Sequence, residues 1–254
     1  MLNYVEYGKE NKYDDDIFFQ KYSQMSRSQQ GLAGAGEWET LRKLLPDFKD
    51  KRVLDLGCGY GWHCIYAMEH GASSVVGVDI SHKMLEVAKE KTHFPQVEYK
   101  CCAIEDVELP EESFDVILSS LAFHYVADYE ILVKKIYRIL KSGGNLVFTV
   151  EHPVFTAYGT QDWHYNEKGE ILYFPVDNYY YEGKRTAVFL GEKVTKFHRT
   201  LTTYLNTLLS NGFIINHIVE PQPPENMMDI PGMQDEMRRP MMLIVSANKN
   251  CYTT

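Results

Sequence analysis

The sequence lacks several features that would indicate particular classes of protein. No Lys/Arg cluster stands out in a chain of 254 residues with a formal net charge of −9. We therefore expect no nucleic-acid partner, since polyanion binding needs a concentrated basic surface. No apolar stretch approaches the length of a membrane span, and the first residues lack the pattern of a secretory signal. We expect a cytoplasmic protein with no membrane partner.

Motifs for metals and disulfides are also missing. The five cysteines stand at positions 58, 64, 101, 102 and 251, and no spacing gives the paired CxxC motifs of zinc or redox sites. No other metal-ligand spacing is present, so we expect no metal. The odd cysteine count fits a reducing compartment.

The chain from residue 51 alternates between short apolar runs and amphipathic stretches, which is typical of an α/β sheet. The runs that predict strands are RVLDLG, SVVGVDI, QVEYKCCAI, FDVILSSLAFHYV, NLVFTVEHP, FIINHIVEP and RPMMLIVSANK. Helices are predicted between them; Ser81 caps one, and Gly143-Gly144 ends another. The fourth run suits a strand that is covered on both faces.

A glycine-rich turn, DLGCGYG, follows the first predicted strand. Glycines let the backbone approach a ligand, and the next helix offers free N–H groups. Nicotinamide-dependent oxidoreductases use GxGxxG, but Gly57, Gly59 and Gly61 give the shorter GxGxG. The carboxylate of Asp55 would repel a pyrophosphate, whereas it would attract a cofactor that carries positive charge. The pattern therefore favours S-adenosylmethionine, which carries sulfonium and ammonium groups.

Acidic positions follow at the ends of the next two strands, where such sheets bind ligands. Asp79 ends the second strand and can accept both ribose hydroxyls of an adenosine, or alternatively cap the next helix. After the third strand, Ala103 and Ile104 can flank an adenine ring. Glu105 or Asp106 can accept from the exocyclic amine, unless these acids form a solvated loop.

These segments resemble a known family. VLDLGCGYGWH, VVGVDIS, AIEDVELPEESFDVILSSLAFHYV and LKSGGNLVFTVEHP look like the successive motifs of class I S-adenosylmethionine-dependent methyltransferases. They are most similar to the small-molecule branch that includes ubiquinone- and menaquinone-type methyltransferases. The resemblance covers residues 37–150. It implies a Rossmann-like, seven-stranded mixed sheet in the order 3-2-1-4-5-7-6, with the last strand antiparallel and helices on both faces.

Four regions are expected on this basis. Residues 1–36 form an N-terminal helical lid over the cofactor, and residues 37–150 form the S-adenosylmethionine-binding core. Residues 151–198 are a substrate-side insertion that carries eleven aromatic residues, and residues 199–254 complete the sheet. The rings of the insertion predict an apolar pocket, the insertion's own core or a dimer contact. The Pro/Met-rich loop 221–240 has no predicted role.

The resemblance also implies a set of cofactor-binding residues. It places Asp55 and the glycine turn at the methionine end, Asp79 on the ribose, and Arg27 at the cofactor carboxylate. Ile80, Ile104 and Glu105 would contact the adenine, and residues 119–121 would lie beneath the sulfonium. The whole predicted set is Tyr22, Arg27, Asp55, Gly57, Cys58, Gly59, Asp79, Ile80, Met84, Ala103, Ile104, Glu105, Ser119 and Leu121.

The expected activity is methyl transfer to a small-molecule acceptor, with an aromatic or quinone-like compound as one candidate. His124 and His198 are the predicted catalytic residues, since histidine suits general-base work near neutral pH. The sequence SSLAFHY replaces the Asn/Asp-Pro-Pro-aromatic run of enzymes that methylate DNA bases or glutamine. The alternative is a non-catalytic protein that binds S-adenosylmethionine or S-adenosylhomocysteine. A nicotinamide-dependent oxidoreductase is a less favoured alternative. The chain can be a monomer or a homodimer.

Overall fold

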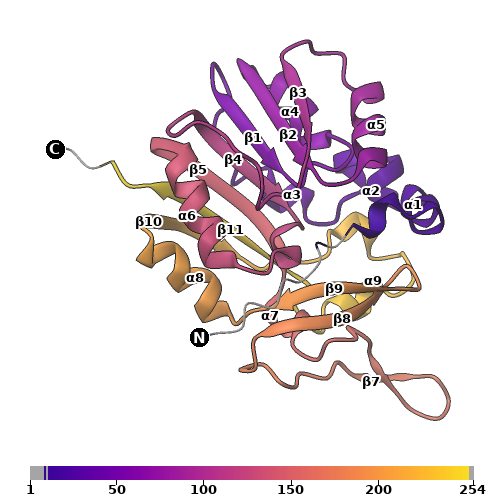
Figure 1. Cartoon of the computed structure of the whole chain (residues 1–254). Coiled ribbons are helices and arrows are strands. Elements are labelled where there is room, and N and C mark those ends of the chain that lie inside the picture. The colour runs from indigo at the N-terminus through magenta and orange to yellow at the C-terminus, as the bar shows by residue number, and fades with distance from the viewer. Residues whose placement is uncertain (1–8, 10, 252–254) are drawn as a thin grey trace.

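A seven-stranded sheet forms the centre of the molecule in the computed structural model, which describes residues 9 and 11–251 (Figure 1). Its strands run in the order β10-β11-β5-β4-β1-β2-β3. Their bounds are β1 (Arg52–Leu56), β2 (Ser74–Asp79), β3 (Val97–Cys101), β4 (Phe114–Ser120), β5 (Leu140–Glu151), β10 (Phe213–Val219) and β11 (Met242–Lys249). Strand β11 runs antiparallel to both of its neighbours, β10 and β5, and the other neighbouring pairs of this sheet are parallel. The predicted strand order and the antiparallel last strand are confirmed.

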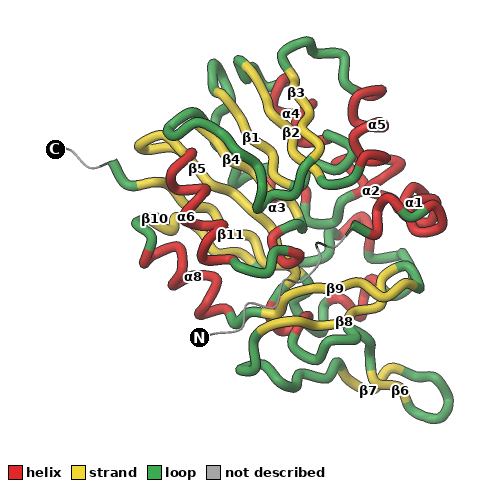
Figure 2. Tube along the Cα trace, in the orientation of Figure 1, coloured by secondary structure: helices red, strands yellow, loops and turns green. Residues whose placement is uncertain are grey.

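Helices cover both faces of the sheet (Figure 2). The helices on one face are α6 (Tyr129–Ile139) and α8 (Leu201–Ser210), and those on the other are α3 (Trp38–Leu41), α4 (Trp62–Glu69) and α5 (His82–Lys91). Alternate side chains of a strand point to opposite faces. Leu54 and Leu56 of β1 therefore pack beneath α6, whereas Val53 packs against the α4 side.

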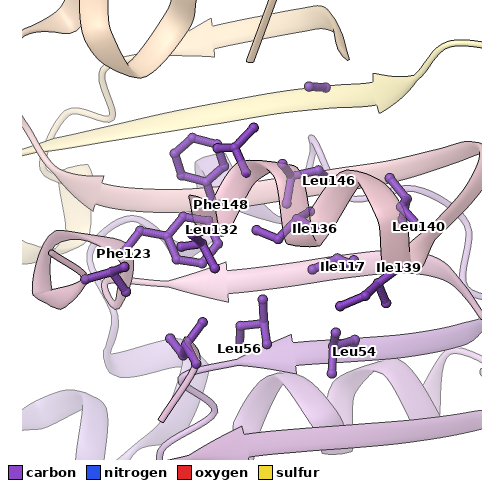
Figure 3. Close-up of a cluster of buried hydrophobic side chains, with 14 of the residues drawn as sticks. Leu54, Leu56, Ile117, Phe123, Leu132, Ile136, Ile139, Leu140, Leu146 and Phe148 are labelled. Carbon is purple, nitrogen blue, oxygen red and sulfur yellow. The ribbon is translucent and has the colours of Figure 1, made fainter. Parts of the chain in front are cut away.

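The larger core cluster lies between the sheet and α6 (Figure 3). Leu132 and Ile136 of α6 point down onto Ile117 of β4 and Leu146 of β5, and all four are buried. Strands buried on both faces read as near-continuous apolar runs. These near-continuous apolar runs are the signal from which the strands were predicted in the sequence.

Some boundaries differ from the prediction. Helix α6 ends at Ile139 because Leu140 already pairs with Phe114 of β4, so Gly143-Gly144 lie within β5 rather than ending the helix. Strand β4 stops at Ser120, and a 3-10 turn, η3 (Phe123–Tyr125), takes up the rest of the predicted strand. Its buried side chains explain why the run looked like a continuous strand. The predicted Ser81 cap is confirmed by its hydroxyl, which accepts from the Met84 N–H at 3.1 Å.

The N-terminal segment and the insertion contact each other beside the sheet. The segment contains η1 (Lys12–Asp14), α1 (Asp16–Ser23), α2 (Ser26–Gln29) and η2 (Gly31–Gly34), and the insertion contains α7 (Pro153–Thr156), β6 (His164–Tyr165), β7 (Ile171–Tyr173), β8 (Gly183–Phe189) and β9 (Glu192–His198). Phe18 of α1 is buried against Ala187 and Val194 of the β8–β9 hairpin. Lys21 Nζ donates to the Leu190 carbonyl of the same hairpin at 2.9 Å. The two segments thus form one covering layer.

The loop between β10 and β11 contains η4 (Glu225–Met227) and α9 (Met233–Glu236). It carries Arg239, whose guanidinium carbon lies 4.5 Å, 5.1 Å and 4.8 Å from the ring centroids of Phe155, Trp163 and Phe174. These three rings of the insertion therefore pack around an arginine as a local core. None of the helices in the described part of the chain has the length and apolar character of a membrane span.

Ile136 and Ile131 on α6 offer a matched test of this packing. Ile136 is 0 % exposed and Ile131 is 52 % exposed. We expect Ile136→Ala to lower the free energy of unfolding by about 2–5 kcal/mol, because a cavity is left in a close-packed core. Ile131→Ala is expected to change it by about 0.5 kcal/mol or less. Urea denaturation of both variants measures the difference, and equal effects would contradict the assigned helix face.

Candidate functional site

A cavity of about 230 Å³ opens where the parallel strands end, as expected for this sheet type. Its wall combines the turn after β1, the ends of β2, β4 and β5, the N-terminal segment and the β8–β9 hairpin. Eleven predicted cofactor residues line it: Tyr22, Arg27, Gly57, Gly59, Asp79, Ile80, Met84, Ala103, Ile104, Glu105 and Leu121. A neighbouring cavity of about 80 Å³ shares Tyr22, Arg27, Gly57, Gly59 and Ser120 with it.

The three glycines of the turn have positive φ angles, of +79° at Gly57, +51° at Gly59 and +75° at Gly61. A Cβ at Gly57 would lie 2.3 Å from the Cβ of Ala122, and one at Gly61 would lie 2.2 Å from the Tyr99 hydroxyl. At Gly59 no atom lies within 4 Å of that position. Gly57 and Gly61 are therefore required by packing, and Gly59 leaves free space beside the cavity.

Asp79 joins the end of β2 to this turn. Its Oδ2 accepts from the Gly59 N–H at 2.9 Å, and its Oδ1 accepts from the Ser81 N–H at 2.9 Å. Burial raises the pKa of the Asp79 carboxyl, although these two hydrogen bonds work against the shift. Because Ser81 supplies the helix cap, the Asp79 carboxylate remains available to the cavity that it lines.

Three predicted cofactor residues lie away from the main cavity. Asp55 is buried beneath the turn, where its Oδ2 accepts from the Cys64 thiol at 3.5 Å. Cys58 lines the smaller cavity. The Ser119 hydroxyl donates to the Leu56 carbonyl at 2.7 Å inside the sheet, and Ser120 lines the cavity instead. Successive residues of a strand face opposite sides, so a shift of one position explains this difference.

Burial gives Asp55 an unusual ionisation. Its side chain is 1 % exposed, and Oδ1 has no hydrogen-bond partner among residues 9 and 11–251. Burial raises the pKa of Asp55 to about 7 from an ordinary value of 3.8. Asp55 lies behind the glycine turn and lines neither cavity. The structure therefore does not place it in direct contact with a ligand, as the sequence had suggested.

The cavity wall also contains residues that the sequence analysis missed. They come from separate elements and are Tyr13, Tyr125, Glu151, Phe189, Lys196, Met241 and Met242. Glu151 Oε1 accepts from Lys196 Nζ at 2.5 Å, and this ion pair is buried. No local sequence signal marks the pair, since its members are 45 positions apart. The hydroxyl groups of Tyr13 and Tyr125 lie 3.4 Å apart, so the N-terminal segment meets η3 at the cavity.

His124 and His198 occupy different environments. His124 lines the cavity, and its Nδ1 accepts from the Glu151 N–H at 3.4 Å. Burial lowers the pKa of His124 to about 4, with smaller effects from its charged neighbours. Such an imidazole is neutral at pH 7 and is a weak base.

His198 does not line either cavity. Its Nδ1 lies 2.7 Å from the Thr156 hydroxyl, and its Nε2 lies 2.9 Å from the Tyr179 carbonyl. Both ring nitrogens are thus engaged in fixing the insertion. This is a structural arrangement, and it offers no free nitrogen to a substrate, in contrast to the predicted catalytic role.

Comparisons with known proteins identify the family of this chain. A model of the family described as "Methyltransferase domain" matches residues 54–148. A Listeria monocytogenes protein, described as a candidate S-adenosylmethionine-dependent methyltransferase, has a crystal structure that is 57% identical, with a TM-score of 0.83 over 87% of this chain and 99% of that chain. A Mesorhizobium loti structure, described as an S-adenosylmethionine-dependent methyltransferase, is 41% identical, with a TM-score of 0.80 over 86% of this chain and 100% of that one.

A ubiquinone biosynthesis O-methyltransferase of Coxiella burnetii is 35% identical over 112 residues, which are 43% of this chain and 47% of that enzyme. The match to this enzyme thus spans about half of its length. The chain belongs to the class I S-adenosylmethionine-dependent methyltransferases. It is an enzyme whose cofactor is S-adenosylmethionine.

The pKa of Asp55 predicts a pH dependence of stability. Between about pH 4 and pH 7 the folded protein retains a proton on Asp55 that the unfolded chain has released. Stability from this group therefore falls as pH rises through that window. Relative to Asp55→Asn, we expect wild type without cofactor to lose at most about 4 kcal/mol across it, since a pKa difference of one corresponds to about 1.4 kcal/mol.

Asp115→Asn is the matched control for this measurement. Although burial acts in the opposite direction, hydrogen bonds from Lys141 and Arg52 leave the pKa of Asp115 below its ordinary value of 3.8. The stability that the Asp115 carboxylate contributes to the folded protein is fully present above its ordinary pKa and is lost only in more acidic solution. Urea unfolding from pH 4 to pH 8 measures both variants. A constant difference between wild type and Asp55→Asn over this range would refute the assignment.

Proposed function

We propose that the protein transfers the methyl group of S-adenosylmethionine to a small-molecule acceptor bound at the far end of the main cavity. The observation that carries this proposal is the single cavity that joins Asp79 and the glycine turn to the buried pair Glu151–Lys196. One end has adenosine-binding chemistry, and the other has polar groups that suit a second ligand. The acceptor end lies beneath the covering layer, and its lining combines apolar side chains with a few polar groups, which suits a small acceptor.

The adenosine end fits the nucleoside. Each Asp79 oxygen accepts one backbone N–H and keeps a lone pair that can accept a ribose hydroxyl. Ile80, Met84 and Ile104 supply apolar contacts for an adenine ring. Of the two acids considered for the exocyclic amine, Glu105 lines the cavity, and we assign this role to it.

The smaller cavity fits the amino-acid end of the cofactor. Trp62 lines it, and the indole Nε1 of this residue is a buried donor without a partner in the described part of the chain. Arg27 holds the buried Glu37 through Nη2 alone, at 2.7 Å and 2.8 Å from its two oxygens. The remaining donors of the guanidinium can bind a carboxylate, and Glu37 can balance an ammonium group. An unpaired indole N–H costs free energy that such a ligand would recover.

Methyl transfer is an in-line displacement in which S-adenosylmethionine supplies an electrophilic methyl group on a sulfonium. The chain contributes alignment and exclusion of water. Tyr13 and Tyr125 meet over the cavity, and Asp14 Oδ1 accepts from the Ser81 hydroxyl at 2.6 Å. This hydrogen bond fixes the N-terminal segment to the N-terminus of α5, which Ser81 caps. We keep His124 as the histidine that contacts the acceptor, and we assign no catalytic role to His198.

Asp79 provides the first test of this proposal. We expect Asp79→Ala to weaken S-adenosylhomocysteine binding by about 1–3 kcal/mol, the free energy of lost charge-assisted hydrogen bonds. Isothermal titration calorimetry measures the affinity. Asp115→Ala serves as the control, since Asp115 also accepts a backbone N–H but does not line either cavity. Unchanged affinity for Asp79→Ala would remove this residue from the ribose site.

Trp62 tests the amino-acid end separately. We expect Trp62→Phe, which removes the N–H and keeps an aromatic ring, to weaken S-adenosylhomocysteine binding by about 1.5–3 kcal/mol. Binding of 5′-methylthioadenosine, which lacks the amino-acid end, is expected to stay the same. Trp163→Phe is the control, because Trp163 packs on Arg239 away from both cavities. Equal losses for the two ligands would contradict this placement.

Turnover is tested by a screen of phenols, quinones, carboxylic acids and amines with S-adenosylmethionine. Release of S-adenosylhomocysteine together with a methylated product is the expected outcome. Tight cofactor binding without turnover of any small acceptor would instead contradict the small-molecule acceptor class.

A further inference from the structure

The polar cluster at the acceptor end is not needed to bind the cofactor. Lys196 and Glu151 form an ion pair with side chains that are 3 % and 13 % exposed. Gln161 closes the cluster, since its Nε2 donates to Glu151 Oε2 at 2.7 Å and its Oε1 accepts from Lys196 Nζ at 2.9 Å. A buried ion pair loses hydration free energy and on its own is weak evidence for stability. Its position on the cavity wall therefore points to a role in binding.

The cluster leaves two hydrogen-bond donors for a ligand. An ammonium group has three N–H bonds, and Lys196 uses two of them, for Glu151 and Gln161. His124 supplies the second donor. Because Nδ1 accepts from the Glu151 N–H, the neutral ring carries its proton on Nε2. Nε2 has no partner among the described residues, and the low pKa of His124, about 4, keeps the ring neutral.

The same geometry disfavours a cationic acceptor. Lys196 Nζ lies 5.5 Å from the ring centroid of Phe189 and 6.0 Å from that of Tyr125. The lysine thus occupies the place between aromatic faces and a carboxylate that a substrate ammonium would take. A second cation there would meet a like charge in a site with little water, which is unfavourable. An oxygen with negative charge gains from the same field.

We propose that this subsite selects acceptors that carry an anionic oxygen, a phenolate or a carboxylate, bound by Lys196 Nζ and His124 Nε2. Tyr125 and Phe189 also line the cavity and offer apolar surface beside Lys196 to the rest of such a molecule. Bonds from charged donors to anionic oxygen are the strong ones in proteins. This inference rests on the proposed function, since it assigns the acceptor class of that site.

The experiment uses protein saturated with S-adenosylhomocysteine and three probes with the same ring. These are benzoate, 4-nitrophenol ionised in mildly alkaline buffer, and benzylamine. We expect benzoate or 4-nitrophenolate to bind at millimolar concentration by calorimetry, and benzylamine not to bind. Which of the two anions binds more tightly separates a carboxylate acceptor from a phenolate acceptor.

Substitutions at Lys196 then locate the binding. We expect Lys196→Met to weaken oxyanion binding by about tenfold or more, the loss of one charge-assisted bond. Lys193→Met is the matched control, because Lys193 lies exposed on the same strand and is expected to have no effect. Since Lys196→Met leaves Glu151 without its cation, the double variant Lys196→Met with Glu151→Gln keeps the site neutral and folded. It is expected to lose oxyanion binding as well.

Three results would overturn the inference: no binding of either anion, binding of benzylamine at least as tight, or full oxyanion affinity in both Lys196 variants. S-adenosylhomocysteine titrations separate these failures from failure of the proposed function. Intact cofactor binding without oxyanion preference refutes the acceptor class alone. Wild-type protein that does not bind S-adenosylhomocysteine refutes both.

Discussion

The hydrogen bond from the Gly59 N–H to the Asp79 carboxylate joins the ends of two neighbouring strands. It fixes the turn after β1 against β2 and aims the carboxylate at the cavity. The same carboxylate accepts from the Ser81 N–H, and Ser81 caps α5. Asp14 then accepts from the Ser81 hydroxyl and from the Lys83 N–H at 3.1 Å. One set of linked hydrogen bonds therefore places the turn, the helix and the N-terminal segment around the cofactor end.

The end of the cavity that we propose for the acceptor is built by other means. The insertion docks on the N-terminal segment through Phe18 and on the β10–β11 loop through Arg239. This packing brings Lys196 to Glu151 in a place with little water. His198 contributes by fixing Thr156 to Tyr179, so a histidine outside the cavity helps to shape it. Tertiary packing thus positions the charged side chains of Lys196 and Glu151. The cofactor end depends instead on backbone hydrogen bonds near the ends of strands.

The fold and most of the residues that line the cavity near the glycine turn were predictable because their signals are local. Buried strands are short apolar runs, and the turn needs glycine at Gly57 and Gly61 for steric reasons that leave a fixed spacing. The sequence did not fix which side chains at the end of β4 face the cavity. The predicted set contained Ser119, whereas Ser120 lines the cavity. The acceptor end could not be predicted, since Tyr13, Glu151 and Lys196 are isolated positions that only the folded chain brings together. His198 was misjudged because residue type alone does not show that both ring nitrogens are engaged.

A crystal structure of the protein with S-adenosylhomocysteine tests the central claim, that the cofactor spans the smaller cavity and one end of the main cavity, in line with an acceptor at the other end. The account predicts ribose hydroxyls on Asp79, the amino-acid end beside Trp62, and the sulfur facing the space bounded by His124 and Lys196. A sulfur that faces away from that space, or a ribose bound elsewhere, would contradict it.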